Sequence, residues 1–398
     1  MKLSKRVGGL KASATLAVTG KAKQMASEGI DVVSLSAGEP DFNVPDAAVA
    51  GVLEALSEKR NRYTQVPGIP ELRAAVAEKL SKENGLAYDP DEIVMTVGAK
   101  QALFNAMQAL LDEGDEVLVP EPYWVSYPAQ IELAGGTLVP VPCRAEDGFR
   151  LDPAAVDDAC TARTRALLLN SPNNPTGAVY AEQALAEVAN IAMKRDLFVI
   201  SDEIYENLVY GDARHVSIVS LDPGMKERAL VVNGFSKSWA MPGWRLGYAA
   251  GPKPLIQAMT RIQGHATSNP TSLVQYAALA VLGAGRDSVN AMRDAFDQRR
   301  RAVCERLQAI EGLSVPVPEG AFYVMPDARG LLPAKFEGQA LKDDTDLALA
   351  LLEKAHVATV PGGAFGAPGC LRLSYAASME DLEKACDRIE AFVARLER

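Results

Sequence analysis

Short apolar segments alternate with helix-length segments from residue 92 onward, and this alternation constrains the fold more than any other feature of the sequence. The predicted strands cover residues 93–97, 116–119, 137–141, 165–169, 197–201, 229–233 and 245–250. The segments between them that have the length of helical crossovers are 99–111, 123–134 and 181–195. Parallel strands need such crossovers. The pattern therefore predicts an α/β fold with a mostly parallel sheet that helices cover on both faces.

The rest of the chain predicts a second, smaller α/β unit. The segments predicted as helices are 14–27, 45–59, 70–84, 287–309, 345–355 and a last one from residue 378. Further short strands are predicted over 31–35, 321–325, 358–360 and 371–374. We predict a large domain over residues 45–285 and a small domain that combines residues 1–44, with an N-terminal arm, and residues 286–398.

Composition and charge exclude several classes of protein. The 398 residues are 48% hydrophobic and carry a formal net charge of −10, which disfavours a nucleic-acid surface. No apolar run approaches the ~20 residues of a membrane span, and no apolar segment of a signal peptide follows the basic N-terminus. The five cysteines form no CxxC pair and the three histidines are scattered, which disfavours a disulfide framework or a metal site. We expect a cytoplasmic protein with no bound metal and no membrane or nucleic-acid partner.

Residues that follow the predicted strands indicate where chemistry takes place, because ligands of doubly wound sheets bind at the carboxyl ends of the strands. Successive strands are followed by Gly98-Ala99-Lys100, by the string NSPNNPTG at 170–177, by Asp202-Glu203-Ile204-Tyr205 and by Gly234-Phe235-Ser236-Lys237. Each string alone has an ordinary explanation, such as a tight turn, a helix cap or an exposed lysine. Their coincidence at successive strand ends is what favours a functional site.

Together these residues can hold a phosphorylated pyridine aldehyde. A lysine such as Lys237 can form a Schiff base, and an aspartate such as Asp202 can keep a pyridine nitrogen protonated. Tyr205 can bond to a ring oxygen, and Trp124 offers a flat face for the ring. The phosphate candidates are Arg245, Ser236 and the turn formed by Gly98, Ala99 and Lys100.

Longer strings cover nearly the whole chain from Leu10 onward. They are SAGEPDF at 36–42, YTQVPGIPELR at 63–73, SPNNPTG at 171–177, SDEIY at 201–205, SK…MPGWRLGY at 236–248, GAFY at 320–323 and RLSYA at 372–376. In these strings the sequence resembles the class I, fold-type I aminotransferases, which depend on pyridoxal phosphate. Within that family it is most similar to bacterial aspartate aminotransferases, some of which also use prephenate.

The resemblance implies roles for individual residues. Lys237 would carry the cofactor, and Asp202 would pair with its pyridine nitrogen. Asn174 would contact the ring oxygen together with Tyr205, while Trp124 would stack on the ring and line the substrate site. The phosphate would be held by Arg245, Ser236 and the backbone of Gly98, Ala99 and Lys100. Tyr63 would reach the phosphate in a neighbouring subunit, which implies a homodimer with shared active sites.

The resemblance also implies the substrates. Arg372, Asn174 and the backbone at Gly38 would bind the α-carboxylate of an amino acid or 2-oxo acid. Lys11, in a K-x-S-A-T string, would bind the distal carboxylate of a dicarboxylic substrate. The expected reaction is ping-pong transfer between L-aspartate and 2-oxoglutarate, with prephenate or arogenate as a further substrate left open.

Other activities are possible for a protein of this fold. Aminotransferases for alanine, aromatic amino acids or kynurenine use the same cofactor, as does a C–S lyase. A nicotinamide dehydrogenase is disfavoured because the chain has no GxGxxG string.

Gly234 stands where many relatives have a hydroxyl residue, which puts one phosphate contact in doubt. His265 lies in a loosely matching stretch, and we expect it on the surface or at an interface.

Overall fold

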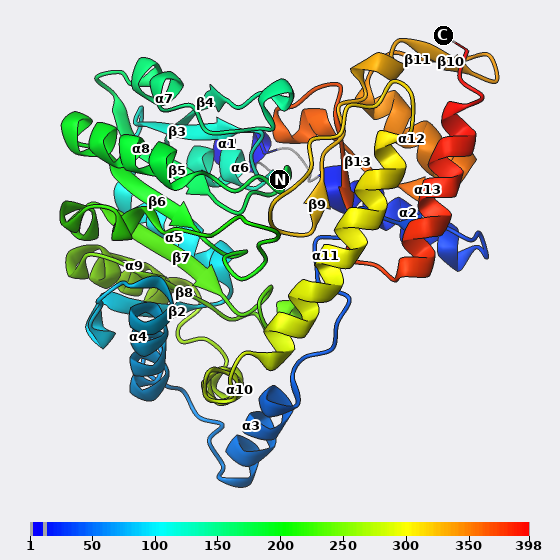
Figure 1. The fold of residues 1–398 in the computed structure, drawn as a ribbon. Coiled ribbons are helices and arrows are strands. Elements are labelled where there is room, and N and C mark those ends of the chain that lie inside the picture. The colour runs from blue at the N-terminus through cyan, green and yellow to red at the C-terminus, as the bar shows by residue number, and fades with distance from the viewer. Residues whose placement is uncertain (1–2, 11–13, 398) are drawn as a thin grey trace.

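A seven-stranded sheet forms the centre of the computed structural model, which describes residues 3–10 and 14–397 (Figure 1). Its strands are β2 (Ile93–Thr96), β3 (Glu116–Glu121), β4 (Thr137–Pro142), β5 (Thr164–Asn170), β6 (Phe198–Asp202), β7 (Ala229–Gly234) and β8 (Gly247–Ala250). They are arranged in the order β2-β8-β7-β6-β5-β3-β4, and β8 alone is antiparallel to its neighbours. The predicted α/β fold with a mostly parallel sheet is confirmed.

The central strands are apolar on both sides because helices cover both faces of the sheet. Val231 of β7 belongs to one buried cluster, whereas its neighbours Leu230 and Val232 belong to a cluster on the opposite face. This alternation follows from the two-residue period of a strand. The position of each strand end, and therefore of the residues that follow it, is fixed by burial of the whole strand.

The helices around this sheet are α3 (Asp46–Ser57), α4 (Pro70–Asn84), α5 (Ala99–Leu110), α6 (Tyr127–Leu133), α7 (Pro153–Ala159), α8 (Glu182–Arg195), α9 (Lys253–Ala266) and α10 (Ser272–Gly283). Buried side chains of α5 and α9 pack on one face, and those of α4 and α8 pack on the other. Helix α4 begins with a proline in its first turn and ends before Gly85, whose φ of +68° is the left-handed conformation that glycine adopts easily.

Except for the short helix α1, which lies beside α6, the remaining elements lie to one side of this sheet, where Figure 1 shows the orange and red C-terminal part together with the blue helix α2. The helices are α1 (Lys5–Gly8), α2 (Ala14–Ser27), α11 (Asp287–Gln308), α12 (Asp344–Ala355) and α13 (Met379–Val393). The strands are β1 (Val33–Ser34), β9 (Tyr323–Val324), β10 (Ala334–Phe336), β11 (Gln339–Leu341), β12 (Val357–Ala358), β13 (Val360–Pro361) and β14 (Leu371–Ser374). Short 3₁₀ helices cover residues 90–92, 145–147, 218–220, 223–227, 242–244, 329–331 and 362–365.

Segments that are distant in the sequence pair in this second region. Strand β1 runs parallel to β12, and β14 lies between β13 and β9 in a small antiparallel sheet. A separate buried cluster joins α11, α12 and α13 to these strands. The division of the chain into domains 45–285 and 1–44 with 286–398 stays a prediction.

A few predicted elements differ from the observed ones. The predicted helix over 123–134 is shorter, because α6 begins only at Tyr127 with Pro128 in its first turn. The predicted strand over 358–360 is split between β12 and β13 at Thr359. No range was predicted for α1, α7, α9, α10 or the β10–β11 hairpin. Among the described residues no helix is both long and apolar enough to span a membrane.

Candidate active site

A cavity of about 830 Å³ opens at the carboxyl ends of β5, β6 and β7. Most residues that the sequence nominated line it: Gly38, Ala99, Lys100, Trp124, Asn174, Asp202, Tyr205, Ser236, Lys237, Arg245 and Arg372. Helix α2 contributes Thr19 and Lys23 to the same wall. The fold therefore gathers residues separated by more than three hundred positions into one site.

Lys237 follows the end of β7, and its side chain reaches into this cavity. Its Nζ donates a hydrogen bond of 2.5 Å to the backbone carbonyl of Gly38. Burial lowers the pKa of Lys237 to about 8, an effect that Glu39 opposes and that Arg372 and Arg245 reinforce. An amine with such a pKa is partly neutral near physiological pH, so it is suited to nucleophilic and proton-transfer chemistry.

Asp202 is the last residue of β6 and is only 4% exposed. Its Oδ2 accepts a hydrogen bond of 2.8 Å from the hydroxyl of Tyr127, and its Oδ1 accepts one of 3.3 Å from the backbone of Ile204. Burial is the main cause that raises the pKa of Asp202 to about 6, and the positive charge of Lys237 is a smaller, opposing effect. A cation in the cavity, such as a protonated ring nitrogen, would stabilise its ionised form.

Two candidate contacts for a ring oxygen lie beside Asp202. The hydroxyl of Tyr205 is 3.0 Å from the hydroxyl of Tyr323, and both rings are buried. The backbone of Asn174 donates to Oδ1 of Asn170 at 2.9 Å, while Nδ2 of Asn170 donates to the carbonyl of Asp202 at 3.0 Å. Asn170 therefore holds the loop after β5 against the end of β6.

Arg372 of β14 forms the opposite wall and is 2% exposed. Its guanidinium donates to Oδ1 of Asn174 at 3.3 Å and to the carbonyl of Ser36 at 2.7 Å, and it lies 4.7 Å from the ring centroid of Tyr323. Burial lowers its pKa. Its Nε has no hydrogen-bond partner among the described residues. A buried guanidinium with unused donors is suited to bind a carboxylate through two hydrogen bonds.

The start of α5 forms a cradle for an anion. Gly98 has a φ of +76°, and a Cβ on it would lie 2.5 Å from a guanidinium nitrogen of Arg245. A Cβ on Gly247 would lie 2.4 Å from the backbone nitrogen of Ala99. Both glycines therefore keep Arg245 and the first amides of α5 accessible, as a phosphate at a helix N-terminus requires. The residues present fit a phosphorylated cofactor.

Two nominated residues lie elsewhere, and a third is not described. Tyr63 is 90% exposed and does not line the cavity. Lys11 falls outside the described residues. His265 is exposed near the end of α9 and does not line the cavity, as expected for a surface residue. Gly98 is part of the cradle without lining the cavity itself.

Close backbone packing explains why residue 234 is glycine where many relatives have a hydroxyl residue. A Cβ at this position would lie 2.9 Å from Cα of Gly247 and 3.0 Å from the carbonyl of Leu246. A hydroxyl side chain does not fit between these backbones. Ser236 lines the cavity and remains the hydroxyl candidate for the phosphate.

Sequence reasoning missed three contributions to the site. Tyr127 bonds to Asp202, but nothing in its neighbourhood distinguishes it from an ordinary buried helix residue. Tyr323 belongs to the GAFY string, yet that string gave it no role. The side chain of Lys100 was overlooked in favour of its backbone, although its Nζ lies 4.7 Å from the ring centroid of Trp124. Partial burial and the charge of Arg245 lower the pKa of Lys100.

Comparisons with known proteins agree with this geometry. A family model described as aminotransferase class I and II matches residues 30–389. The chain is 47% identical to an aspartate aminotransferase of Geobacillus stearothermophilus and 46% identical to an aspartate/prephenate aminotransferase of Cereibacter sphaeroides, over 99% of each chain. The structure of an aspartate aminotransferase from Thermus thermophilus with maleate matches with a TM-score of 0.93 and 46% identity, covering 98% of this chain and 100% of the other.

The chain belongs to the class I and II aminotransferase family. It is therefore a transaminase, and the resemblance found in its sequence strings is confirmed. Transaminases act on an amino acid and a 2-oxo acid, which both carry the α-carboxylate for which the Arg372 wall is suited.

Proposed function

We propose that this protein is a pyridoxal-phosphate-dependent aspartate aminotransferase, which transfers the amino group of L-aspartate to 2-oxoglutarate by a ping-pong mechanism. The observation that carries the proposal is that Asp202 at the end of β6, Lys237 after β7 and Arg372 of β14 line one cavity. Relatives named aspartate aminotransferase, at 44–47% identity over nearly the full chain, support the choice of substrate.

Pyridoxal phosphate fits the groups that the cavity presents. Lys237 would bind its aldehyde carbon, and the buried carboxylate of Asp202 would hold its ring nitrogen protonated. Arg245, Ser236 and the amide of Ala99 would hold its phosphate. When bound, this cofactor supplies a ring that spreads the negative charge left at the substrate Cα after proton removal.

Lys237 would also move the proton of the substrate. Its pKa of about 8 leaves part of the amine population neutral at physiological pH, so Nζ can accept a proton from Cα and later return it. Arg372 would hold the α-carboxylate with the donors that remain beyond Asn174 and Ser36. Fixing the carboxylate orients the Cα–H bond toward the Lys237 amine.

A dicarboxylic substrate needs a second cation, and two lysines are candidates. The sequence predicts that Lys11 binds the distal carboxylate, and this role stays a prediction. Lys100 already lies at the cavity wall over Trp124. A relative solved with maleate, itself a dicarboxylate, supports a site with two cationic ends.

The ratio of aspartate to alanine activity distinguishes these two lysines. Lys11→Ala or Lys100→Ala should lower this ratio at least tenfold if the lysine pairs with the distal carboxylate, because alanine lacks that group. Lys82→Ala, on the exposed side of α4, is the matched control. An unchanged ratio in both variants would contradict a lysine-based distal site.

A homodimer with shared active sites is part of the proposal. Val49, Leu53 and Leu56 lie on one face of α3 and are 43%, 62% and 48% exposed. Helix α3 projects from the molecule, and the neighbouring Tyr63 is 90% exposed (Figure 1). An apolar face of this kind favours burial against a second copy, which would bring Tyr63 to the partner's phosphate site. Light scattering should give twice the chain mass.

A substrate panel tests the function as a whole. Purified protein loaded with pyridoxal phosphate should form oxaloacetate from aspartate and 2-oxoglutarate faster than it transaminates alanine, phenylalanine or kynurenine. The name of the Cereibacter sphaeroides relative extends the proposal to prephenate and arogenate. Release of pyruvate from cystathionine, without amino transfer from aspartate, would instead support a C–S lyase. We place the activity in the cytoplasm, which fractionation of the source cells would test.

A further inference from the structure

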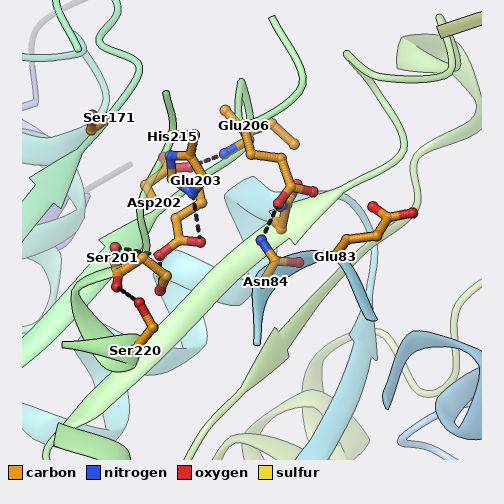
Figure 2. A network of polar contacts seen from close by, with 12 residues as sticks. Glu83, Asn84, Ser171, Ser201, Asp202, Glu203, Glu206, His215 and Ser220 are labelled. Atoms are coloured by element: carbon orange, nitrogen blue, oxygen red, sulfur yellow. Dashed lines mark hydrogen bonds and ion pairs between the residues drawn. The ribbon is translucent and has the colours of Figure 1, made fainter. Parts of the chain in front are cut away.

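A buried ionic network lies directly behind Asp202, outside the cavity described above (Figure 2). Its first member is Glu203, the next residue in the chain, which is 1% exposed. Because Glu203 follows the last residue of β6, its backbone N–H still bonds to the carbonyl of Val232 in β7 at 2.8 Å. A shift of Glu203 would therefore also move Asp202.

Every oxygen of the Glu203 carboxylate has a partner. Oε1 accepts hydrogen bonds from the hydroxyls of Ser201 at 2.8 Å and Ser217 at 2.6 Å. Oε2 lies 3.1 Å from Nε2 of His215, whose side chain is 7% exposed. Figure 2 shows Ser201 and His215 beside the carboxylate of Glu203. The two hydroxyls donate hydrogen bonds to Oε1, and His215 is the group that can bring a positive charge to this carboxylate.

A second carboxylate in the network is already neutralised. Glu206 forms a buried ion pair with Lys79 of α4, in which both side chains are 4% exposed, and it also accepts a hydrogen bond of 2.6 Å from Asn84. Its backbone N–H donates to the carbonyl of Glu203 at 2.9 Å. Ligand atoms of Glu203, Glu206 and His215 lie within 4.8 Å of one another, but Lys79 supplies the cation that Glu206 needs. His215 is thus left as the counter-charge of Glu203.

The charge of Glu203 matters because of its neighbour. Its carboxylate raises the pKa of Asp202, in addition to the larger effect of burial. Burial lowers the pKa of His215, but the carboxylates of Glu203 and Glu206 outweigh burial and raise it above its ordinary value. A protonated His215 would therefore cancel the negative charge that disfavours ionisation of Asp202.

The groups around His215 are consistent with a charged ring. Lys79, Glu203 and Glu206 act on its charge. The cavity that it borders is also lined by Glu83, Arg214 and Arg286. Tyr88 and Tyr248 interact with Glu203. Nδ1 of His215 has no protein partner among the described residues. His215 borders a second cavity of about 510 Å³, but its Nδ1 atom is buried, so the carboxylates of Glu203 and Glu206 are what favours a charged ring.

We propose that Glu203 and His215 form a positioning pair, in which the protonated imidazole cancels the charge of Glu203 so that Asp202 stays ionised for the ring nitrogen of the cofactor. The pair touches neither substrate nor cofactor, and it acts through the position and charge of Asp202. This inference rests on the proposed function, because only a cofactor with a protonated ring nitrogen needs an ionised Asp202.

The pH dependence of cofactor binding tests the proposal. Pyridoxal phosphate is titrated into the cofactor-free full-length protein from pH 5 to 8.5, and its dissociation constant is measured by absorbance. Binding should weaken as the pH falls and Asp202 becomes protonated, and the pH at which half of the affinity is lost is the midpoint. His215→Gln keeps a hydrogen-bond donor but removes the charge, so this midpoint should rise by about one unit. In Glu203→Gln this midpoint should not rise, and in the double variant it should return close to the wild-type value.

A matched control and a second readout separate charge from folding. His356→Asn, at the end of α12, should leave the midpoint unchanged. Nitrogen NMR of the three histidine rings, assigned by elimination with His265→Gln and His356→Asn, should show His215 as an imidazolium at pH 7.5 and as a neutral ring in Glu203→Gln. This second measurement remains informative if His215→Gln fails to fold.

The outcomes are distinguishable. A neutral His215 at pH 7.5, or a midpoint that His215→Gln leaves unchanged while cofactor still binds, would overturn the positioning pair and leave the proposed function intact. A double variant as strongly shifted as His215→Gln would also overturn it. Failure of the wild-type protein to bind pyridoxal phosphate at any pH would overturn both proposals.

Discussion

Replacing Asp202 by asparagine should stabilise the cofactor-free protein even though it damages the active site. The raised pKa of Asp202, about 6 against an ordinary 3.8, means that an ionised carboxylate at pH 7.5 costs about 3 kcal/mol of folding free energy. Asparagine removes this cost. An asparagine side chain has one acceptor oxygen, whereas the two oxygens of Asp202 accept hydrogen bonds from Tyr127 and Ile204. Loss of one of these bonds should lower the free energy of unfolding by about 1 kcal/mol. The expected net gain is about 2 kcal/mol.

The pH dependence fixes the sign of this effect. A carboxyl group whose pKa is raised by folding contributes stability below pH 3.8, and this contribution is lost as the pH rises through about 6. The advantage of Asp202→Asn should therefore be largest at pH 7.5. At pH 5 the cost of the ionised carboxylate falls to about half, so most of the net advantage should disappear.

Urea unfolding of the cofactor-free protein at pH 7.5 and pH 5, at one fixed protein concentration, measures both values. Asp158→Asn, which removes the same charge from the exposed side of α7, is the control and should change stability little at either pH. Added pyridoxal phosphate should stabilise the wild type more than the Asp202→Asn variant. An Asp202→Asn variant that is less stable at pH 7.5 without cofactor, or equally affected at both pH values, would refute the reasoning.

Three further variants test other parts of the site. Gly247→Ala should weaken binding of pyridoxal phosphate at least tenfold, measured by absorbance titration, because its Cβ would cover the backbone nitrogen of Ala99. Arg372→Ala should lower kcat/KM for aspartate by about 10³-fold while cofactor affinity stays near normal, and loss of both would contradict a substrate role. Tyr63→Phe should weaken cofactor binding in the dimer several-fold, because one hydrogen bond to the phosphate would be lost, and an unchanged affinity would remove its predicted role.

The strand ends were predictable from the sequence because burial on both faces makes β5, β6 and β7 continuous apolar runs. Once those runs are placed, the fold must bring Asp202 and Lys237 to the same edge of the sheet. Short strands were also predicted over 31–35 and 358–360, near β1 and β12, but the pairing of β1 with β12 could not be predicted because it joins distant segments. Local signals do not report such long-range pairing.

The residues that hydrogen-bond to the site residues from behind were less predictable than the site residues themselves. Tyr127 and Tyr323 bond to functional side chains, but a buried tyrosine in a sequence has no mark that separates packing from hydrogen bonding. Glu203 and His215 were hidden for the same reason: twelve residues separate them, and only the folded loop after β6 brings them together. The position of the Lys100 side chain over Trp124 was not predictable, because the spacing of residues in the sequence does not tell where a side chain points.

Chemical trapping tests the central claim most directly. Borohydride reduction of the protein loaded with pyridoxal phosphate would fix the cofactor to the amine that holds it, and peptide mapping by mass spectrometry would locate the modified residue. The account predicts one phosphopyridoxyl group per chain, on Lys237, and its absence from a Lys237→Ala variant. Label on a different lysine, or a loaded protein that incorporates none, would contradict it.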